Sequence, residues 1–391
     1  MPATRSSPSN DPRLITSLDQ PAAVDPERVG AKAAALALAR HDGLPVLPGF
    51  VVESSASRLH MQLGASALRA RGSGGARLAV GSEPVAAADL FVDAGRGLAP
   101  TLAVRSSSPL ESSGYWAGAF TSYIGIAPEE LPKAIAGCWA SAFSVDALGR
   151  QSQVGIGPGT IPMAVLVQPA IEPGVGGVAE VRPDGSLWIE AVAGSPAGLL
   201  QGWESGAVAT KRERWQGDDA IALVGAETLD HLGVVLAKVS ERYGYDRCEW
   251  GLASSLWILQ LQKMESHRPS AWESSRLAAV LAEGDRYQGI AVANGVGIGR
   301  RHHVNGEDPK APPAGAVVTA STALPSLSQL IWGAAGLVTH RGSPAAHVFE
   351  AARSLGVPAV CGVDLGPATD QIVAVDGYSG KVATLPVPPI P

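Results

Sequence analysis

The histidine at position 347 stands in a pattern that suits phosphoryl chemistry. The residues that follow it place apolar side chains at the spacing of one helix face, namely Val348, Ala351, Ala352 and Leu355. Gly356 then suits the end of a helix, so the sequence predicts that His347 is the first residue of a helix and that its imidazole is displayed. The unpaired N–H groups of a helix N-terminus would stabilise a phosphoryl group on that ring. A phosphohistidine is one interpretation, and a surface histidine that caps a helix is the other.

The elements around this histidine predict a mixture of sheet and helix. Short apolar runs typical of buried strands cover 316–320, 336–339, 358–363 and 371–376 in the C-terminal part, and 102–105, 163–168, 248–252 and 256–260 before it. Apolar residues at helical spacing predict helices over 33–40 and 228–243. We therefore expect α/β and α+β architecture, with the predicted histidine helix inside a compact C-terminal β/α domain.

Composition restricts the class of protein. A chain of 391 residues is long enough for two or three domains. The net charge of −6 argues against nucleic acid and anionic membrane surfaces as partners, and no apolar stretch is long enough to span a bilayer. The three cysteines are isolated and the N-terminus lacks an apolar signal region, so we expect a cytoplasmic, reduced protein.

Several motifs together resemble the family of phosphoenolpyruvate synthase, pyruvate phosphate dikinase and rifampin phosphotransferase. The segments that resemble its ATP-grasp nucleotide-binding domain are Val29–Lys32, Pro45–Phe50, Val104–Glu111 with Tyr115–Gly118, Glu249–Trp250 and Leu259–Gln260. The segments that resemble its swivelling phosphohistidine domain are Gly295–Gly299, Gly315–Val318, Ala335–Val338 and the run that begins at His347. The resemblance covers the chain from about Val29 to Val382.

The resemblance implies four parts along the chain. Residues 1–16 are expected to be a disordered N-terminus, and 17–266 an ATP-grasp-like nucleotide-binding domain. Residues 267–286 are expected to be a linker that acts as a hinge, and 287–391 the swivelling phosphohistidine domain. The fold class expected is therefore an N-terminal ATP-grasp domain followed by a compact C-terminal β/α domain.

The resemblance also implies roles for individual residues. Lys32 and Arg105 would neutralise the triphosphate of ATP, Gly118 would lie in the phosphate loop, and Gln168 would stand where the family holds adenine. Glu249 and Gln260 would be oxygen ligands of Mg²⁺. The alternatives are surface charge for Lys32 and Arg105, an edge-strand role for Gln168, and half-buried strand positions for Glu249 and Gln260.

The chain departs from the family pattern at several positions. Gln262 stands where the family carries an arginine beside the phosphates, Ala346 where it has Ser, Thr or Cys, and Arg341 where glycine is common. The stretch Gly198–Gly202 replaces a Gly-Leu-Gly-Glu loop. Only about twenty residues separate the two predicted domains, which is far below the size of an independent acceptor domain.

The predicted function is an ATP-dependent phosphotransferase, of kinase or dikinase type, that uses ATP and Mg²⁺. ATP would phosphorylate or pyrophosphorylate His347, the C-terminal domain would swing, and the phosphoryl group would pass to a small-molecule acceptor. Two alternatives remain open. One is a phosphohistidine carrier subunit of a split system, whose acceptor is held by a separate protein. The other is a degenerate module that binds nucleotide without turnover, which the replacement of arginine by Gln262 would allow.

Overall fold

The computed structural model describes residues 14–182, 184–264, 284–304, 311–366 and 370–386, together with 278, 280 and 282. These residues form two compact units, and each is built from segments that are separate in sequence. Unit 1 comprises the residues up to Ser112, Gly118–Glu172 and Ala253–Leu261. Unit 2 comprises Ser113–Ala117, Pro173–Leu252 and the residues from Gln262 onward.

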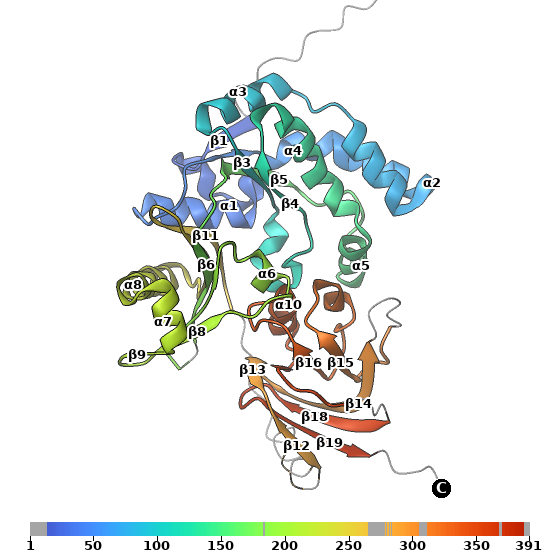
Figure 1. The fold of residues 1–391 in the computed structure, drawn as a ribbon. Helices are drawn as coiled ribbons and strands as arrows, with labels where there is room; N and C mark the ends of the chain where they lie inside the picture. Colours follow the sequence, from blue (N-terminus) through green and yellow to red (C-terminus); the bar gives the residue numbers. More distant parts are fainter. Residues whose placement is uncertain are drawn as a thin grey trace, which may run out of the picture. The chain divides into compact units, whose positions relative to one another are not determined.

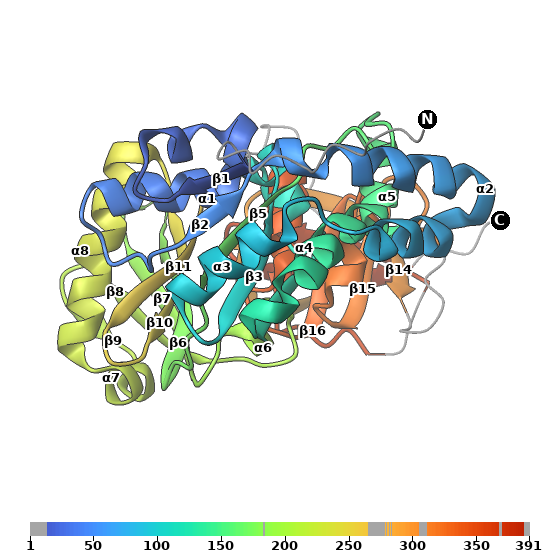
Figure 2. The same ribbon diagram turned by 90° about the horizontal axis from the view of Figure 1, so that it is seen from above.

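Unit 1 is a five-stranded sheet covered by helices (Figure 1). Its strand order is β1 (Ile15–Ser17), β2 (Phe50–Val52), β5 (Ala164–Pro169), β3 (Leu102–Ser107) and β4 (Ser122–Ile126), and every neighbouring pair is antiparallel. Its α-helices are α1 (Pro26–His41), α2 (Arg58–Ser82), α3 (Ala88–Leu98), α4 (Leu131–Ala140) and α5 (Val145–Gln153). Helix α1 packs against β3 and β5, and α4 packs against β3 and α2 (Figure 2).

Helix α1 is interrupted at a glycine that brings it close to β3. Asp25 caps the helix by accepting a hydrogen bond from the Glu27 backbone N–H at 3.0 Å. Gly30 then has a φ of +77°, a left-handed conformation that glycine tolerates without steric cost. A Cβ at this position would lie 2.2 Å from the Ser107 carbonyl, so only glycine allows the helix to approach the end of β3 this closely.

Unit 2 contains most of a second sheet, with helices packed on it. The sheet has the order β11 (Leu256–Gln262), β10 (Arg247–Leu252), β6 (Val175–Val181), β7 (Leu187–Ala193), β8 (Ala207–Lys211) and β9 (Trp215–Gln216). Strand β11 is divided between the units, because its residues before Gln262 belong to unit 1. Helices α7 (Asp218–Val224) and α8 (Ala226–Tyr243) pack on β6, β7, β8 and β10, and the short α6 (Ala197–Leu200) follows β7.

The C-terminal part of unit 2 is an eight-stranded sheet that carries α10 (His347–Leu355). The order is β12 (Asp285–Gln288), β19 (Lys381–Pro386), β18 (Gln371–Asp376), β14 (Val296–Val304), β15 (Val317–Thr322), β16 (Gly336–Arg341), β17 (Ala359–Cys361) and β13 (Ile290–Ala293). Strands β14 to β17 run parallel, and α10 connects β16 to β17. Val348, Phe349, Ala351 and Ala352 of α10 are buried in one apolar cluster with residues of this sheet.

These observations establish a mixed α/β architecture, as we expected. Two predicted boundaries differ from the structure. Ile15 and Thr16, assigned to the disordered terminus, lie in β1, where the Thr16 hydroxyl donates a hydrogen bond to buried Glu53 at 2.5 Å. Asp285 and Arg286, assigned to the linker, lie in β12, which pairs with β19. A polar edge strand has no apolar pattern to reveal it.

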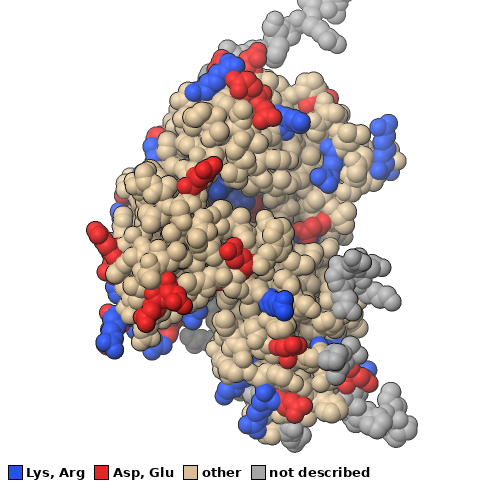
Figure 3. Space-filling model, in the orientation of Figure 1, with Lys and Arg blue, Asp and Glu red and all other residues tan. Residues whose placement is uncertain are grey.

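Most of the predicted linker, from 267 to 283, lies outside the described residues, as do 1–13 of the predicted disordered N-terminus. Residues 173–252 pack with the C-terminal part of the chain, whereas the sequence groups them with the nucleotide-binding part. Within the described ranges, no single helix is long and apolar enough to cross a membrane. Helices α7 and α8, which meet at an angle of 91°, together have the length and apolar composition of a broken membrane span. On the face drawn in Figure 3, basic and acidic side chains are interspersed.

Candidate functional site

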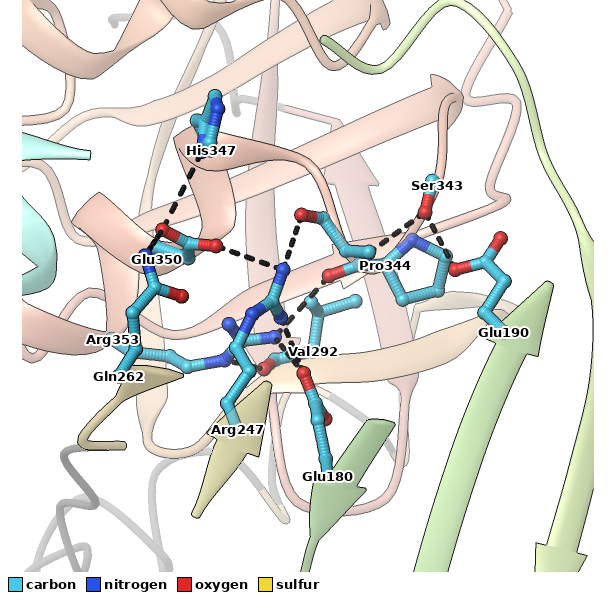
Figure 4. A network of polar contacts seen from close by, with 11 residues as sticks. Glu180, Glu190, Arg247, Gln262, Val292, Ser343, Pro344, His347, Glu350 and Arg353 are labelled. Atoms are coloured by element: carbon cyan, nitrogen blue, oxygen red, sulfur yellow. Dashed lines mark hydrogen bonds and ion pairs between the residues drawn. The ribbon is translucent and has the colours of Figure 1, made fainter. Parts of the chain in front are cut away.

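His347 begins α10 and faces an acidic residue one turn along the same helix. The helix starts directly after Ala346, whose backbone is extended, and ends at Gly356 with a φ of +65°. His347 Nδ1 lies 3.5 Å from Glu350 Oε2, as the i and i+3 positions of a helix allow (Figure 4). The predicted helix start is confirmed. The prediction that the ring is displayed is wrong, because only 16% of the His347 side chain is exposed.

Glu350 is the centre of the polar contacts around His347. Its Oε1 lies 2.8 Å from Arg247 Nη2, and its Oε2 accepts a hydrogen bond from Gln262 Nε2 at 3.0 Å (Figure 4). Burial raises the pKa of Glu350. The positive charge of Arg247 and the contact with His347 outweigh this effect and lower the pKa to about 2. Glu350 is therefore ionised at any pH at which an enzyme would work.

Arg247 joins α10 to the sheet of β6 and β10. Arg247 and Glu180 are directly opposite each other in the β10–β6 register and form an ion pair that is almost completely buried. Arg247 Nη2 also donates to the Ala345 carbonyl at 2.5 Å. Arg353 of α10 lies 3.7 Å from the same Glu180 carboxylate and donates to the Val292 carbonyl at 2.9 Å. Two arginines and two glutamates thus form one buried charge network.

A second buried contact lies next to this network. Ser343, four residues before His347, donates a hydrogen bond from Oγ to Glu190 Oε2 of β7 at 2.6 Å. The Gly206 backbone N–H donates to the other oxygen of Glu190 at 2.8 Å. Burial raises the pKa of Glu190, and these two hydrogen bonds oppose the increase. The loop before α10 is therefore attached to the sheet by a buried carboxylate.

Strand alternation explains why these side chains meet. Successive residues of a strand point to opposite faces, so Val178 and Glu180 of β6 share a face, as do Trp188 and Glu190 of β7. Val178 and Trp188 are buried in one cluster with Ala345, which marks this face as the one that contacts the loop before α10. The charged residues of the same face therefore reach α10 and its loop.

The segment that resembles the family's phosphate loop also packs on α10. The 3-10 helix η5 (Gly114–Trp116) contacts α10, and the rings of Tyr115 and Trp332 have centroids 5.4 Å apart. A Cβ on Gly114 would lie 2.9 Å from the Glu350 carbonyl oxygen, so glycine permits this approach. The residues Ser113–Ala117 belong to unit 2 together with α10.

The predicted nucleotide-binding residues lie in unit 1. Lys32 Nζ is 2.5 Å from Glu111 Oε1, and both side chains are largely buried. Arg105 of β3 donates to the Leu259 carbonyl at 2.8 Å, and Gln168 at the end of β5 donates to the Leu47 carbonyl at 2.9 Å. Gly118 has a φ of +68° in the loop before β4.

The backbone brings two of these predicted residues into one region. The Ala31 N–H donates to the Ser108 carbonyl at 3.1 Å, and the Ala33 N–H donates to Ser107 Oγ at 3.1 Å. The start of α1, which carries Lys32, is thereby fixed to the end of the strand that carries Arg105.

The predicted metal ligands occupy separate units. Glu249 of β10 belongs to unit 2 and Gln260 of β11 belongs to unit 1. Glu249 Oε1 is buried and has no hydrogen-bond partner in the part of the chain that the structure describes. An unsatisfied buried carboxylate oxygen costs free energy, and a bound cation would remove that cost, so Glu249 fits a metal ligand. The described residues include no group of three or more His, Cys, Asp or Glu side chains arranged around a metal position.

Sequence reasoning missed the partners of His347. Glu350 was detectable, because an acidic residue three positions after a histidine lies on the same side of a helix. Glu180 and Glu190 each interrupt an apolar strand, which signals a buried charge that needs a partner. The pairing of Arg247 with both Glu180 and Glu350 depends on sheet register and on tertiary packing, and no local pattern predicts it.

Comparison with known proteins identifies the class of this chain. Residues 85–205 match the family model of the pyruvate phosphate dikinase AMP/ATP-binding domain, and residues 312–380 match that of the mobile domain of PEP-utilising enzymes. The second match contains α10 and His347. The chain therefore contains segments similar to an AMP/ATP-binding domain and to the mobile domain of PEP-utilising enzymes. Both matches agree with the resemblance to phosphoenolpyruvate synthase and pyruvate phosphate dikinase that the motifs of this chain predicted.

A curated relative is similar to a large part of this chain. A probable phosphoenolpyruvate synthase of Archaeoglobus fulgidus is 23% identical over 323 residues, which cover 72% of this chain and 43% of the relative. This chain thus spans less than half the length of that relative.

Two solved structures show weaker likenesses. A dinucleotide-forming acetyl-coenzyme A synthetase 1 of Ca. Korarchaeum cryptofilum is 10% identical, with a TM-score of 0.29 and coverage of 59% of this chain and 90% of that chain. Aconitase X of Thermococcus kodakaraensis is 20% identical, with a TM-score of 0.22 and coverage of 26% of this chain and 99% of that chain. TM-scores of this size do not establish a shared fold.

Proposed function

We propose that this chain is an ATP-dependent phosphotransferase that passes a phosphoryl group from ATP through His347 to a small-molecule acceptor. The observation that carries the proposal is the position of His347 at the first residue of α10, inside the segment that matches a mobile domain. In this proposal residues 17–266 form an ATP-grasp domain, 267–286 a linker, and 287–391 the swivelling domain.

The chemistry proposed is covalent catalysis in two transfers. A ring nitrogen of His347 attacks phosphorus in the triphosphate, the bond from that phosphorus to the bridging oxygen breaks, and ADP or AMP leaves. The second transfer breaks the P–N bond, and an acceptor oxygen or nitrogen takes the phosphoryl group. Apposition of η5 and α10 supports the first step, because η5 resembles the family's phosphate loop and lies against the helix that His347 begins.

The proposal assigns a role in nucleotide or metal binding to six residues. Lys32 and Arg105 would neutralise phosphate charge, Gly118 would let the backbone approach the phosphates, and Gln168 would lie beside the adenine. Glu249 and Gln260 would hold Mg²⁺, which, when bound, offsets the charge of the triphosphate. The orphaned Glu249 Oε1 supports the metal assignment.

The direct test is the covalent adduct on His347. We expect intact mass spectrometry after incubation with ATP and Mg²⁺, at neutral to alkaline pH, to show a phosphorylated protein that loses the group in acid. His347→Ala should abolish the adduct, whereas His340→Ala, a control on β16 of the same domain, should retain it. An adduct of equal yield in His347→Ala would disprove the assignment.

The identity of the acceptor separates the proposal from its closest alternative. The second candidate is a split system, in which a separate protein holds the acceptor. Nucleotide release by the isolated chain should be slow and should accelerate with small hydroxyl, carboxylate or amine acceptors. Acceleration only by a second protein would favour the split system, and rapid hydrolysis with water alone would contradict both.

A further inference from the structure

We propose that Glu350 is a positioning residue that holds the His347 ring with its proton on Nδ1, so that Nε2 is the nitrogen that receives the phosphoryl group. Arg247 and Gln262 hold Glu350 in place for this role. The inference rests on the proposed function, since it concerns the nucleophile of that reaction.

The contacts of the Glu350 carboxylate leave little freedom for the side chain. Oε1 pairs with Arg247 at 2.8 Å, and Oε2 accepts a hydrogen bond from Gln262 Nε2 at 3.0 Å (Figure 4). His347 Nδ1, which is buried and makes no hydrogen bond among the described residues, lies 3.5 Å from the same Oε2. The Glu350 side chain is 4% exposed, so water does not compete strongly for these oxygens. Because the carboxylate is fixed in this way, a hydrogen-bond donor is favourable at the position that His347 Nδ1 occupies beside Oε2.

The electrostatics select one tautomer of the ring. A neutral imidazole carries one N–H and one lone pair, and an ionised carboxylate can only accept. The nitrogen that faces Glu350, which is Nδ1, therefore carries the proton, and the lone pair is left on Nε2. When Nε2 bonds to phosphorus and the bond to the nucleotide oxygen breaks, the ring gains positive charge, which the Glu350 carboxylate stabilises.

The residues that hold Glu350 lie outside its own helix. Arg247 is in β10 and Gln262 ends β11, whereas His347 and Glu350 are both in α10. Gln262 thus occupies the position where the family has an arginine, and here it binds the carboxylate that faces the histidine. The orienting contacts would be complete only while α10 is packed against these strands.

The sharpest variant is Glu350→Gln, because it reverses the donor pattern. Arg247 can only donate, so the amide oxygen of the new side chain must face Arg247, and its NH₂ group must face His347 Nδ1. Nδ1 would then accept, and the ring proton would move to Nε2. Phosphorylation of His347 should fall by roughly 10² to 10⁴, the scale of a wrong tautomer.

The tautomer can be read without ATP, from the ring nitrogen shifts of ¹⁵N-histidine-labelled protein at alkaline pH. The His347→Ala spectrum assigns the signal. We expect an Nδ1–H ring in the wild type, an Nε2–H ring in Glu350→Gln, and no change in Glu241→Gln, an exposed control on α8. Glu350→Asp, which keeps the charge, should retain the Nδ1–H ring.

The outcomes separate this inference from the proposed function. An Nε2–H ring in the folded wild type overturns the inference, even if Glu350→Gln fails to fold. An adduct that forms at the wild-type rate in folded Glu350→Gln also overturns it, while the proposed function stands. An Nδ1–H ring that depends on Glu350, in a protein that never forms an adduct with Mg-ATP, supports the positioning role and refutes the proposed function.

Discussion

Arg247 of β10 and Glu350 of α10 form an ion pair in the interior of unit 2, with Nη2 2.8 Å from Oε1 and side-chain exposures of 1% and 4%. The same arginine pairs with Glu180 on the neighbouring strand. One buried guanidinium therefore compensates two carboxylates, one in the sheet and one in the helix that His347 begins. Removing it would leave both acids buried beside a single remaining arginine, Arg353.

Arg247→Met should destabilise the protein strongly. Removing one partner of a buried ion pair leaves an uncompensated charge and costs about 3 to 5 kcal/mol. The free energy of unfolding, measured in urea by circular dichroism, should fall by that amount. Arg214→Met, at an exposed position in the same unit, should stay within about 0.5 kcal/mol of the wild type. Equal effects of the two substitutions would show that the network contributes nothing beyond surface charge.

Gly30→Ala and Gly72→Ala form a matched pair in unit 1. Both glycines interrupt a helix at positive φ, +77° and +66°, so each alanine incurs about 1 to 3 kcal/mol of backbone strain. At Gly72 no atom lies within 4 Å of the added Cβ, whereas at Gly30 the Ser107 backbone lies at 2.2 Å. Gly30→Ala should therefore be the more destabilising by about 1 to 3 kcal/mol in urea unfolding. The reverse order would mean that α1 does not approach β3 as described.

Glu190→Gln should change how stability depends on pH. Burial raises the pKa of Glu190 above its ordinary value of 4.5, so the unfolded chain releases this proton first and the wild type loses stability as pH rises above 4.5. A glutamine at position 190 can donate to Ser343 Oγ and accept from the Gly206 N–H. It has no proton to release, so the variant does not lose stability in this way as the pH rises. The difference in Tm, variant minus wild type, should therefore increase from pH 4.5 upward. A difference in Tm that does not change with pH would contradict this prediction.

Lys32→Met should weaken nucleotide binding, if the proposed site is correct. A charge-assisted contact to phosphate contributes roughly 1.5 to 3 kcal/mol, so the Kd for Mg-ATP from calorimetry should rise by about 10- to 150-fold. Lys133→Met, at an exposed position on α4, serves as the charge-matched control and should bind like the wild type. A thermal melt without ligand distinguishes lost binding from lost folding, since Glu111 also loses its ion pair with Lys32.

The sequence predicts the helix of the site better than it predicts the contacts. Periodic apolar residues and Gly356 indicate α10 because both act within a few residues. Helix α2 is not indicated in the same way, because its glycines weaken both helix propensity and the apolar pattern. The apolar runs that predict β3, β5, β10 and β16 correspond to buried strands, since burial on both faces leaves a continuous pattern.

The network around His347 could not be read from the sequence for a different reason. Glu180 and Arg247 are separated by 67 positions and meet only through the register of β6 and β10. Gln262 and Glu350 are separated by 88 positions. Such contacts depend on which strands pair and on what packs against them, and a single sequence carries no signal for either.

The close approach of Gly114 to α10 limits which residue can stand at position 114. Residues 113–117 belong to unit 2, but Ser112 before them and Gly118 after them belong to unit 1. Within unit 2, Gly114 of this short segment lies against the backbone of Glu350 in the helix of His347. A side chain at Gly114 would press on the carbonyl of Glu350, so it would displace the turn of α10 that carries the carboxylate facing His347.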